Sequence, residues 1–240
     1  MPLGIGMGIS PVFGGGLSYI QRVLATDPIA YWVLGERAGN VARCQVLAAQ
    51  NGQHVGVTLG QPGIGDGNTC PYYDGTNDYT NVQTATLAGR FNGAEGTVIV
   101  WMRVANAGVW TDGQGREMIR VFVNANNHVR ISKAAINNSV FSQYVAGGVT
   151  KTVQVANTSL ANQCFGATWS SAADEFRLYI DGVPVGVTQT ILGAWVGVPV
   201  VSVIGASSIV PAAPWHGWLA HVPLWNRALA PAEMADLYRP

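Results

Sequence analysis

The sequence is short of charge. Only 11 % of its 240 residues are Asp, Glu, Lys or Arg, and the formal net charge is zero, whereas typical domains carry roughly 25 %. Lys133 and Lys151 are the only lysines. This balance argues against binding to nucleic acid, which needs a basic surface, and against a polybasic membrane anchor. Either neutral polar side chains cover a soluble monomer or neighbouring molecules cover much of the surface, and composition leaves both open.

Cysteine is also scarce. Cys44, Cys70 and Cys164 lie far apart, and no CxxC pair is present. An odd number leaves at least one thiol free or paired between chains. One disulfide stays open, but buried, unreactive thiols are the favoured interpretation. A chain of this length buries enough core to fold without a disulfide or a metal.

Signals for a leader peptide or a membrane span are missing as well. The opening MPLGIGMGISPVFGGG lacks the basic and continuous apolar regions of a signal peptide. The uncharged stretch 182–215 is interrupted by prolines and glycines, which predicts buried strands rather than a spanning helix. Residues 1–16 form a Gly-rich apolar arm that precedes one domain, residues 17–240. We predict that this arm docks on a partner through Leu3, Ile5, Met7, Ile9, Val12 and Phe13.

After the arm the pattern is mainly β. Ser18 is placed to cap a short helix over residues 19–25, and Pro231 to begin another in which Met234, Leu237 and Tyr238 share a face. Between them, apolar or alternating runs separated by turn residues predict strands. These runs lie at 97–104, 118–123, 128–132, 175–180, 200–205 and 218–225. Many short strands of this kind indicate a single all-β sandwich or barrel.

Five segments in order resemble one family. They are PIAYWVLGERAG (28–39), QPGIGDGNTCPYYDGTNDYTNV (61–82), TVIVWMRV (97–104), FRLYIDGVPV (176–185) and WHGWLAHVPLWNRALAPAEMADLY (215–238). Together they resemble the laminin-G-like, concanavalin-A-like jelly rolls. The resemblance implies an all-β, two-sheet antiparallel jelly-roll sandwich with a short helix near each end. Its first strand would run through the interior, so that both Tyr31 and Trp32 are buried.

The leading helix followed by PIAYWVLGE is similar to the variant found in bacteriophage virion proteins. That resemblance implies a non-enzymatic structural or adhesion protein of a virion, as capsid decoration, fibre or tail component. Its partners would be other virion proteins, copies of itself and, weakly, host-surface glycans. The alternative is a secreted or cell-surface carbohydrate-binding module.

Catalytic and metal-binding patterns are absent where the family would place them. Glucanases of this fold resemble one another in a Glu-x-Asp-x-x-Glu strand, which this chain lacks, and no serine nucleophile elbow is present. We therefore expect no enzyme. Relatives often bind calcium, but Cys44 and Ala220 stand where acids are common, so we expect that site to be lost and no cofactor to be needed. Asp66, Asp74 and Asp78 are the remaining candidates for a weaker site.

Two tryptophans are the candidates for contact with a glycan. Strand alternation explains Trp110 and Trp195 least well among the aromatic residues. The favoured interpretation is that they cover the ends of the core or contact a neighbouring subunit. The alternative is that a sugar stacks on them. His216 and His221 flank a predicted strand at an odd spacing, which places them on opposite faces and argues against a metal pair.

Overall fold

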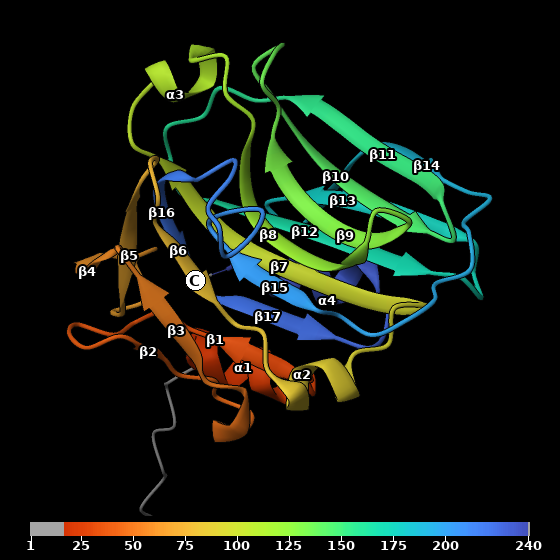
Figure 1. The fold of residues 1–240 in the computed structure, drawn as a ribbon, viewed down its shortest axis with the longest axis horizontal. Helices are drawn as coiled ribbons and strands as arrows, with labels where there is room; N and C mark the ends of the chain where they lie inside the picture. Colours follow the sequence, from red (N-terminus) through yellow and green to blue (C-terminus); the bar gives the residue numbers. More distant parts are fainter. Residues whose placement is uncertain (1–16, 240) are drawn as a thin grey trace, which may run out of the picture.

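The computed structural model describes residues 17–239 as two antiparallel β-sheets packed face to face (Figure 1). The six predicted arm residues lie outside this range, and the division into an arm and a domain stays a prediction. Nine strands form one sheet, in which β17 pairs with both β7 and β1: β14 (Val183–Gln189), β13 (Glu175–Ile180), β12 (Gln163–Ser170), β7 (Glu95–Val104), β16 (His216–Ala220), β5 (Thr69–Asp74), β4 (Thr58–Pro62), β17 (Val222–Trp225) and β1 (Ala30–Trp32). The predicted jelly-roll sandwich is confirmed.

The second sheet has eight strands, and its outer face is turned toward the viewer in Figure 1. Its strands, in order across the sheet, are β11 (Val149–Ala156), β10 (Ser139–Ala146), β9 (Asn127–Lys133), β8 (Arg116–Asn124), β15 (Val201–Ile204), β6 (Tyr79–Asn81), β3 (Gly52–Val55) and β2 (Val41–Ala42). Short helices complete the fold: α1 (Tyr19–Ala25), η1 (Ala48–Gln50), α2 (Ala85–Arg90), α3 (Gly108–Thr111) and α4 (Pro231–Asp236).

Both predicted terminal helices are present, and each begins where local chemistry starts it. The Ser18 hydroxyl accepts a hydrogen bond from the Gln21 backbone N–H at 3.3 Å, and the Gln21 side chain accepts one from the Ser18 N–H at 2.9 Å. This reciprocal capping box satisfies two donors that a helix start leaves open. Pro231 occupies the start of α4, where its fixed backbone angle suits a helix.

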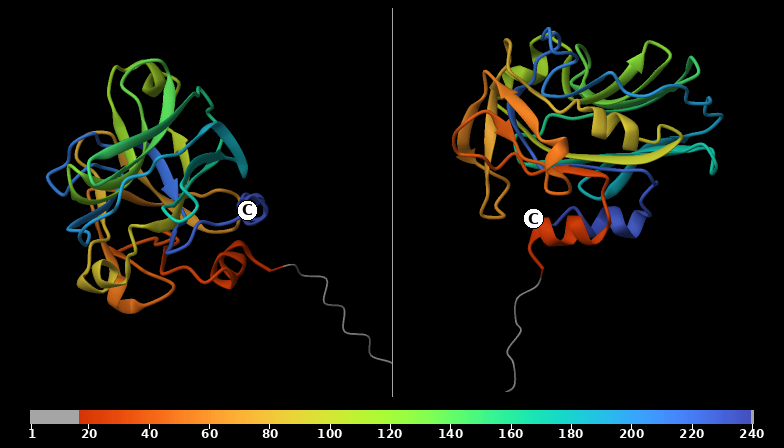
Figure 2. Two further views of the ribbon diagram at one scale, coloured as in Figure 1. Left: turned by 90° about the vertical axis from the view of Figure 1, so that its right-hand side faces the viewer. Right: turned by 60° about the horizontal axis from the view of Figure 1, so that its bottom comes forward.

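The core has two parts. The larger lies between the sheets and contains Trp32, which is 1 % exposed and donates from its indole N–H to the Gln50 carbonyl at 2.9 Å. The smaller lies on the outer side of the nine-stranded sheet, under α1 and α4, which sit next to each other in Figure 2. Tyr31 belongs to this second cluster. Both rings of the first strand are therefore buried as predicted, because helices cover the face that Tyr31 occupies.

The structure corrects two details of the predicted strands. The run 218–225 is two strands, because His221 adopts a left-handed backbone conformation (φ 47°) between β16 and β17. The break lets β17 stay paired with β7 while it takes β1 as its other neighbour. Within the stretch 182–215, β15 is largely buried, but β14 is an exposed edge strand rather than a buried one.

The described residues include no helix that is both long enough and apolar enough to cross a membrane. All three cysteines are buried and free. The prediction that the cysteines are buried is confirmed, and no disulfide forms among them.

Candidate functional site

Strands β8 and β9 carry a polar surface on the outer face of the eight-stranded sheet. Val121 points into the core, so its neighbours Arg120 and Phe122 point outward. The same alternation on β9 sends Val129 and Ile131 inward. The adjacent strand β10 adds its own outward side chains. We call the resulting set the β8–β10 surface: Glu117, Arg120, Phe122, His128, Arg130, Ser132, Phe141 and Gln143.

A β-bulge brings the acidic residue to this surface. The pairing of β8 with β9 shifts register between Glu117 and Ile119. The extra residue reverses the alternation at that point, so Glu117 faces the same side as Arg120, three residues away. Its Oε1 lies 2.9 Å from Arg130 Nη1 and 3.8 Å from Arg120 Nη1. Glu117 is also the only acidic residue in the strands of this sheet.

Burial governs the charge of this carboxyl group. The side chain of Glu117 is only 4 % exposed. Burial raises its pKa above the usual value, and the charges of Arg120 and Arg130 offset only part of that increase. The site therefore holds a carboxyl group whose ionised form is costly, beside two guanidinium groups that remain charged.

Gln143 fixes the proton positions next to them. Its Oε1 accepts from Arg130 Nε at 3.1 Å, and an arginine can only donate, so the amide orientation is determined. His128 Nε2 lies 3.1 Å from the same oxygen and must donate to it. Burial lowers the pKa of His128, so the ring is neutral at neutral pH and its Nδ1 is an acceptor.

Four buried polar atoms of this surface have no protein hydrogen-bond partner within residues 17–239. They are Glu117 Oε2, Arg120 Nε, His128 Nδ1 and Ser132 Oγ. Glu117, His128 and Ser132 are each more than nine-tenths buried. Unpaired buried polar groups are costly and uncommon in folded proteins. The clustering of four such atoms on one sheet face makes the β8–β10 surface the candidate site.

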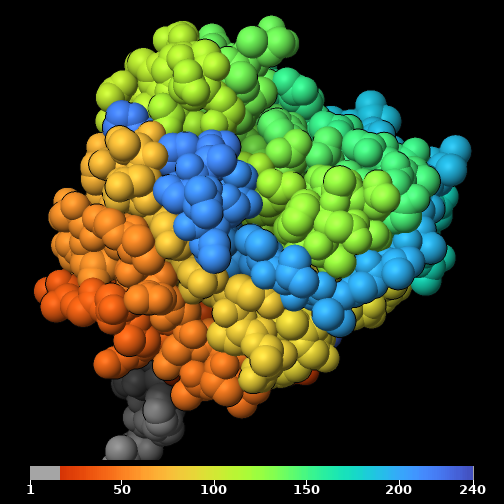
Figure 3. All heavy atoms as spheres, in the orientation of Figure 1, coloured from red at the N-terminus to blue at the C-terminus, as the bar shows by residue number. Residues whose placement is uncertain are grey.

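Aromatic rings support the two arginines. The Arg120 guanidinium lies 4.4 Å from the Phe122 ring centroid, and that of Arg130 lies 4.9 Å from Phe141. Cation–π contact of this kind holds a guanidinium flat and restrains it. In Figure 3 the green residues of β8 and β9 lie beside the blue segment that follows β15. That segment closes one end of the surface, where the Glu117 N–H donates to the Ala213 carbonyl at 2.9 Å.

A different polar cluster lies at the corresponding place on the nine-stranded sheet, under α1. His221 Nδ1 is 2.6 Å from the Tyr31 hydroxyl, and its Nε2 is 3.0 Å from Asp66 Oδ2. Burial alone would raise the pKa of Asp66, but hydrogen bonds from His221 and Asn68 outweigh it and lower the pKa to about 2. Both ring nitrogens of His221 lie within 3.0 Å of a protein oxygen, although the contact of Nε2 with Asp66 is not a well-aligned hydrogen bond. We therefore regard this cluster as structural.

The residues present do not fit the calcium site that the family implies. Ala220 supplies no side-chain oxygen, and the thiol of Cys44 is buried beside Gln50. The carboxylate of Asp66, which could have been a calcium ligand, contacts the imidazole of His221, the residue after Ala220. Asp74 and Asp78 accept from backbone N–H groups. Within the described range no three acidic, histidine or cysteine side chains come together as a metal site, so no step is assigned to calcium.

The two tryptophans proposed for glycan contact lie apart from the β8–β10 surface. Trp110 is in α3, where it is 2 % exposed and donates to the Ser159 carbonyl at 3.1 Å. Its ring offers no face to a sugar. Trp195 is partly buried and stacks on Tyr144, with ring centroids 5.8 Å apart. It also lies against Gly93, where a Cβ atom would come within 2.1 Å of the indole.

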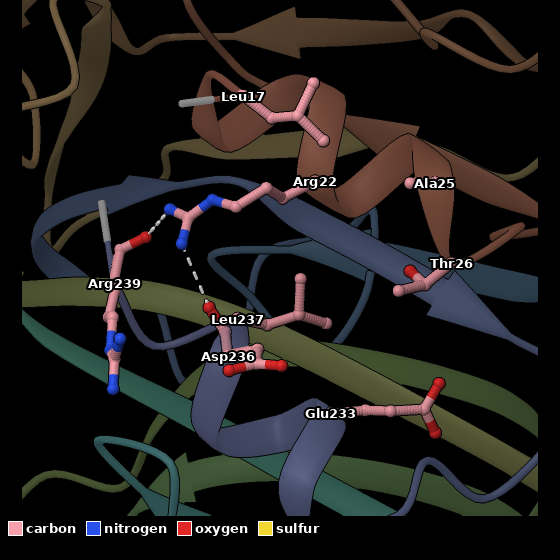
Figure 4. Close-up of a pocket in the computed structure, with 8 residues that line it drawn as sticks. All are labelled: Leu17, Arg22, Ala25, Thr26, Glu233, Asp236, Leu237 and Arg239. Carbon is pink, nitrogen blue, oxygen red and sulfur yellow. Dashed lines mark hydrogen bonds between the residues drawn. The ribbon is translucent and has the colours of Figure 1, made fainter. Parts of the chain in front are cut away.

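A hollow with a volume of about 390 Å³ lies between α1 and α4 (Figure 4). Most of the charged groups at its rim are already engaged. Arg22 reaches across from α1 and donates to the backbone carbonyls of Asp236 and Arg239. Glu233 pairs with Arg227 at 2.7 Å. One buried polar atom of its lining, Arg22 Nε, has no partner in the part of the chain that the structure describes, whereas the β8–β10 surface has four such atoms.

Sequence reasoning missed this surface, and also an aromatic pair on the nine-stranded sheet. Tyr72 and Trp218 are register partners with ring centroids 5.0 Å apart, and Arg103 lies 4.1 Å from the Trp218 ring. The available signal was the presence of Arg120 and Arg130 in β runs of a chain with little charge. Their relation to Glu117 and Gln143 depends on the bulge and on the register of three strands.

Comparisons with known proteins agree on the fold. The model of the concanavalin A-like lectin/glucanases superfamily, of the laminin G type, matches residues 74–235, more than half of the chain. No curated protein sequence matches this chain. Domain 4 of AbnA, a GH43 extracellular arabinanase from Geobacillus stearothermophilus, solved with arabinotriose, is similar, with a TM-score of 0.67 and 11 % identity over 88 % of this chain and 98 % of that one.

Two larger structures are also similar. The botulinum neurotoxin serotype D binding domain has a TM-score of 0.64 and 13 % identity over 88 % of this chain. The chain spans about half of that domain, 51 % of its length. Trypanosoma rangeli sialidase has a TM-score of 0.62 and 10 % identity, over 87 % of this chain and 32 % of the enzyme. At such identities the structural likeness shows the fold alone, and it is the family match that assigns the chain to the concanavalin A-like lectin/glucanase superfamily.

Proposed function

We propose that this protein is a non-catalytic carbohydrate-binding module that holds a glycan on the β8–β10 surface. The observation that carries the proposal is the set of buried polar atoms without partners in residues 117, 128 and 132, on a sheet face that no helix of the described range covers. Sugar hydroxyls both donate and accept hydrogen bonds, so a saccharide is matched to such a mixed set. The arabinotriose complex of AbnA domain 4 supports the same class of ligand for this fold.

The proposal excludes catalysis on a chemical ground. Glycoside hydrolysis ordinarily needs two carboxyl groups roughly 5 to 10 Å apart. The strands of this sheet supply one, Glu117. A single carboxyl group between two arginines can orient a ligand, but it does not provide an acid and a base.

A glycan array followed by calorimetric titration tests the proposal. We expect a hit in the micromolar range and at least a tenfold loss of affinity, about 1.4 kcal/mol, in Gln143→Ala. That substitution removes the shared anchor of His128 and Arg130. Trp195→Ala and Trp218→Ala are the matched controls for the two competing aromatic positions, and thermal melting checks that each variant is folded.

Two results would contradict it. An array without hits removes the function. Loss of binding in Trp195→Ala or Trp218→Ala, with the affinity of Gln143→Ala unchanged, would show that the glycan binds elsewhere on the molecule.

A second proposed role is attachment to a phage virion through residues 1–16. Its support is the apolar composition of that arm, the low charge of the chain and the resemblance of the 28–36 segment to virion proteins. The proposed localisation is the virion surface, and the partners are other virion proteins and copies of the chain. Deleting residues 1–16 should abolish attachment to particles and leave the melting temperature unchanged. A truncated protein that still decorates particles would refute this role.

A further inference from the structure

The two arginines of the β8–β10 surface lie directly opposite each other. Arg120 and Arg130 are Cα partners in the register of β8 and β9. Both approach the same carboxylate oxygen, Glu117 Oε1, at 3.8 and 2.9 Å. Two guanidinium groups therefore share one acidic partner.

The surrounding charges leave this pair with a positive excess. Glu117 is the only acidic residue in the strands of the sheet, and the neighbouring His128 is neutral at neutral pH. Lys133 is on the opposite face of β9, where its Nζ is 2.7 Å from Asp112 Oδ1. Lys151, on β11, is basic as well, so it does not offset the positive excess. Two positive groups thus face one carboxyl group, whose ionisation burial already opposes.

The side chains of both arginines are partly open to solvent. The side chains of Arg120 and Arg130 are 20 % and 26 % exposed, and Arg120 Nε has no partner in the described range. Phe122 and Phe141 each cover one side of a guanidinium plane. Arg130 Nε and Nη1 already donate to Gln143 and Glu117, and Arg120 Nε is buried, so a ligand would be met by the terminal Nη groups. A planar fork of this kind binds a carboxylate through two parallel hydrogen bonds.

We propose that the glycan bound by this surface is acidic and that its carboxylate is held by Arg120 and Arg130. This inference rests on the proposed function and specifies its ligand class. The ligand carboxylate supplies the second negative charge that the arginine pair lacks. Ser132 Oγ and His128 Nδ1 are buried in the unliganded protein, so they meet the ring hydroxyls of the sugar only if the side chains above them move.

The experiment compares acidic sugars with matched neutral ones by calorimetric titration of the full chain. The probes are an oligogalacturonate, a sialylated oligosaccharide, and each of these with its carboxyl group reduced to an alcohol. We expect one of the acidic probes to bind, which identifies the source of the carboxylate. Carboxyl reduction should weaken that binding about 10- to 100-fold, the usual value of a charge-assisted hydrogen bond to a partly buried group.

Variants locate the contact. Arg120→Gln and Arg130→Gln should each lose about tenfold or more in affinity. Arg130→Lys, which keeps the charge but not the planar fork, should fall between Arg130→Gln and the parent. Arg177→Gln is the matched control, because Arg177 also pairs with a glutamate, Glu175, but lies on the other sheet. Its affinity should equal that of the parent.

The outcomes separate the two proposals. If a neutral or carboxyl-reduced glycan binds as tightly as its acidic form, this inference is overturned while the carbohydrate-binding function stands. If Arg177→Gln weakens binding and the two β8–β10 arginine variants do not, the inference is again overturned. If no glycan of either kind binds, both proposals fail together.

Discussion

The two outer faces of the sandwich each bury a carboxyl group, but they differ in what surrounds it. On the nine-stranded sheet, α1 and α4 cover an apolar cluster, and the carboxylate of the buried Asp66 side chain lies 3.0 Å from His221 Nε2. On the eight-stranded sheet no helix covers β8 and β9, and the buried Glu117 retains an oxygen without a partner. The comparison teaches that burial of a polar group marks a structural site where its partners are complete. It marks a candidate binding site where they are not.

The pKa directions of the two carboxyl groups express the same difference. Hydrogen bonds from His221 and Asn68 lower the pKa of Asp66 to about 2 despite burial. Burial raises the pKa of Glu117 in spite of two nearby arginines. The first carboxylate stabilises the fold when ionised, whereas ionisation of the second opposes folding.

The largest expected effect comes from the helix-covered face. Trp225 is fully buried there, and its indole N–H donates to the Thr26 hydroxyl at 3.1 Å. We expect Trp225→Ala to lower the free energy of unfolding by about 3 to 5 kcal/mol, measured in urea. Phe122→Ala, on the open face, should cost about 1 kcal/mol because that ring is only partly buried. An equal loss in the free energy of unfolding for both variants would show that the helix-covered face is no more important for stability than the open one.

A smaller effect is expected from Asp66→Asn. The folded pKa of Asp66 is about 2, below the value near 3.9 of an unfolded chain. Its stabilisation is therefore present above about pH 4 and is lost as the pH falls toward 2. The variant should lose about 2 kcal/mol at neutral pH and show a shallower acid transition in circular dichroism. The matched control Asp74→Asn, at the exposed end of β5, removes a carboxyl group that has no histidine contact of this kind in the described chain. A variant Asp66→Asn with unchanged stability would refute the pairing with His221.

The smallest effect on stability is expected from Glu117→Gln. Because the folded pKa of Glu117 is raised, the parent loses stability as the pH rises from the unfolded value through the folded one. Glutamine is never ionised, so the variant should lack this loss and be at least as stable as the parent at neutral pH. A decrease of more than about 1 kcal/mol would mean that the ion pairs with Arg120 and Arg130 contribute net stability.

The predictable parts of the fold were those fixed by local sequence. Ser18 and Gln21 form the expected capping box, and Asp181–Gly182 forms a turn in which both residues have positive φ, as a two-residue hairpin of this type requires. The alternation of β13 was also correct, yet Tyr179 is only 1 % exposed on its outward side. Its burial depends on α4, which lies far from Tyr179 in the sequence, at the end of the domain.

The candidate site was not predictable in the same way. Alternation along β8 would place Glu117 and Arg120 on opposite faces, and only the bulge brings them together. The role of Gln143 depends on the register between β9 and β10. Large aromatic residues in loops drew attention instead to Trp110, which packing places in the core. Site chemistry here is set by pairing between strands, which a single sequence does not display.

Chemical-shift mapping tests the central claim most directly. A labelled sample of the protein is titrated with the acidic oligosaccharide that binds most tightly, and backbone amide shifts are followed. The account predicts that the largest shifts fall on β8, β9 and β10, around Arg120, Arg130 and Gln143. Shifts confined to the α1–α4 hollow, to Trp195 or to the Tyr72–Trp218 pair would contradict it.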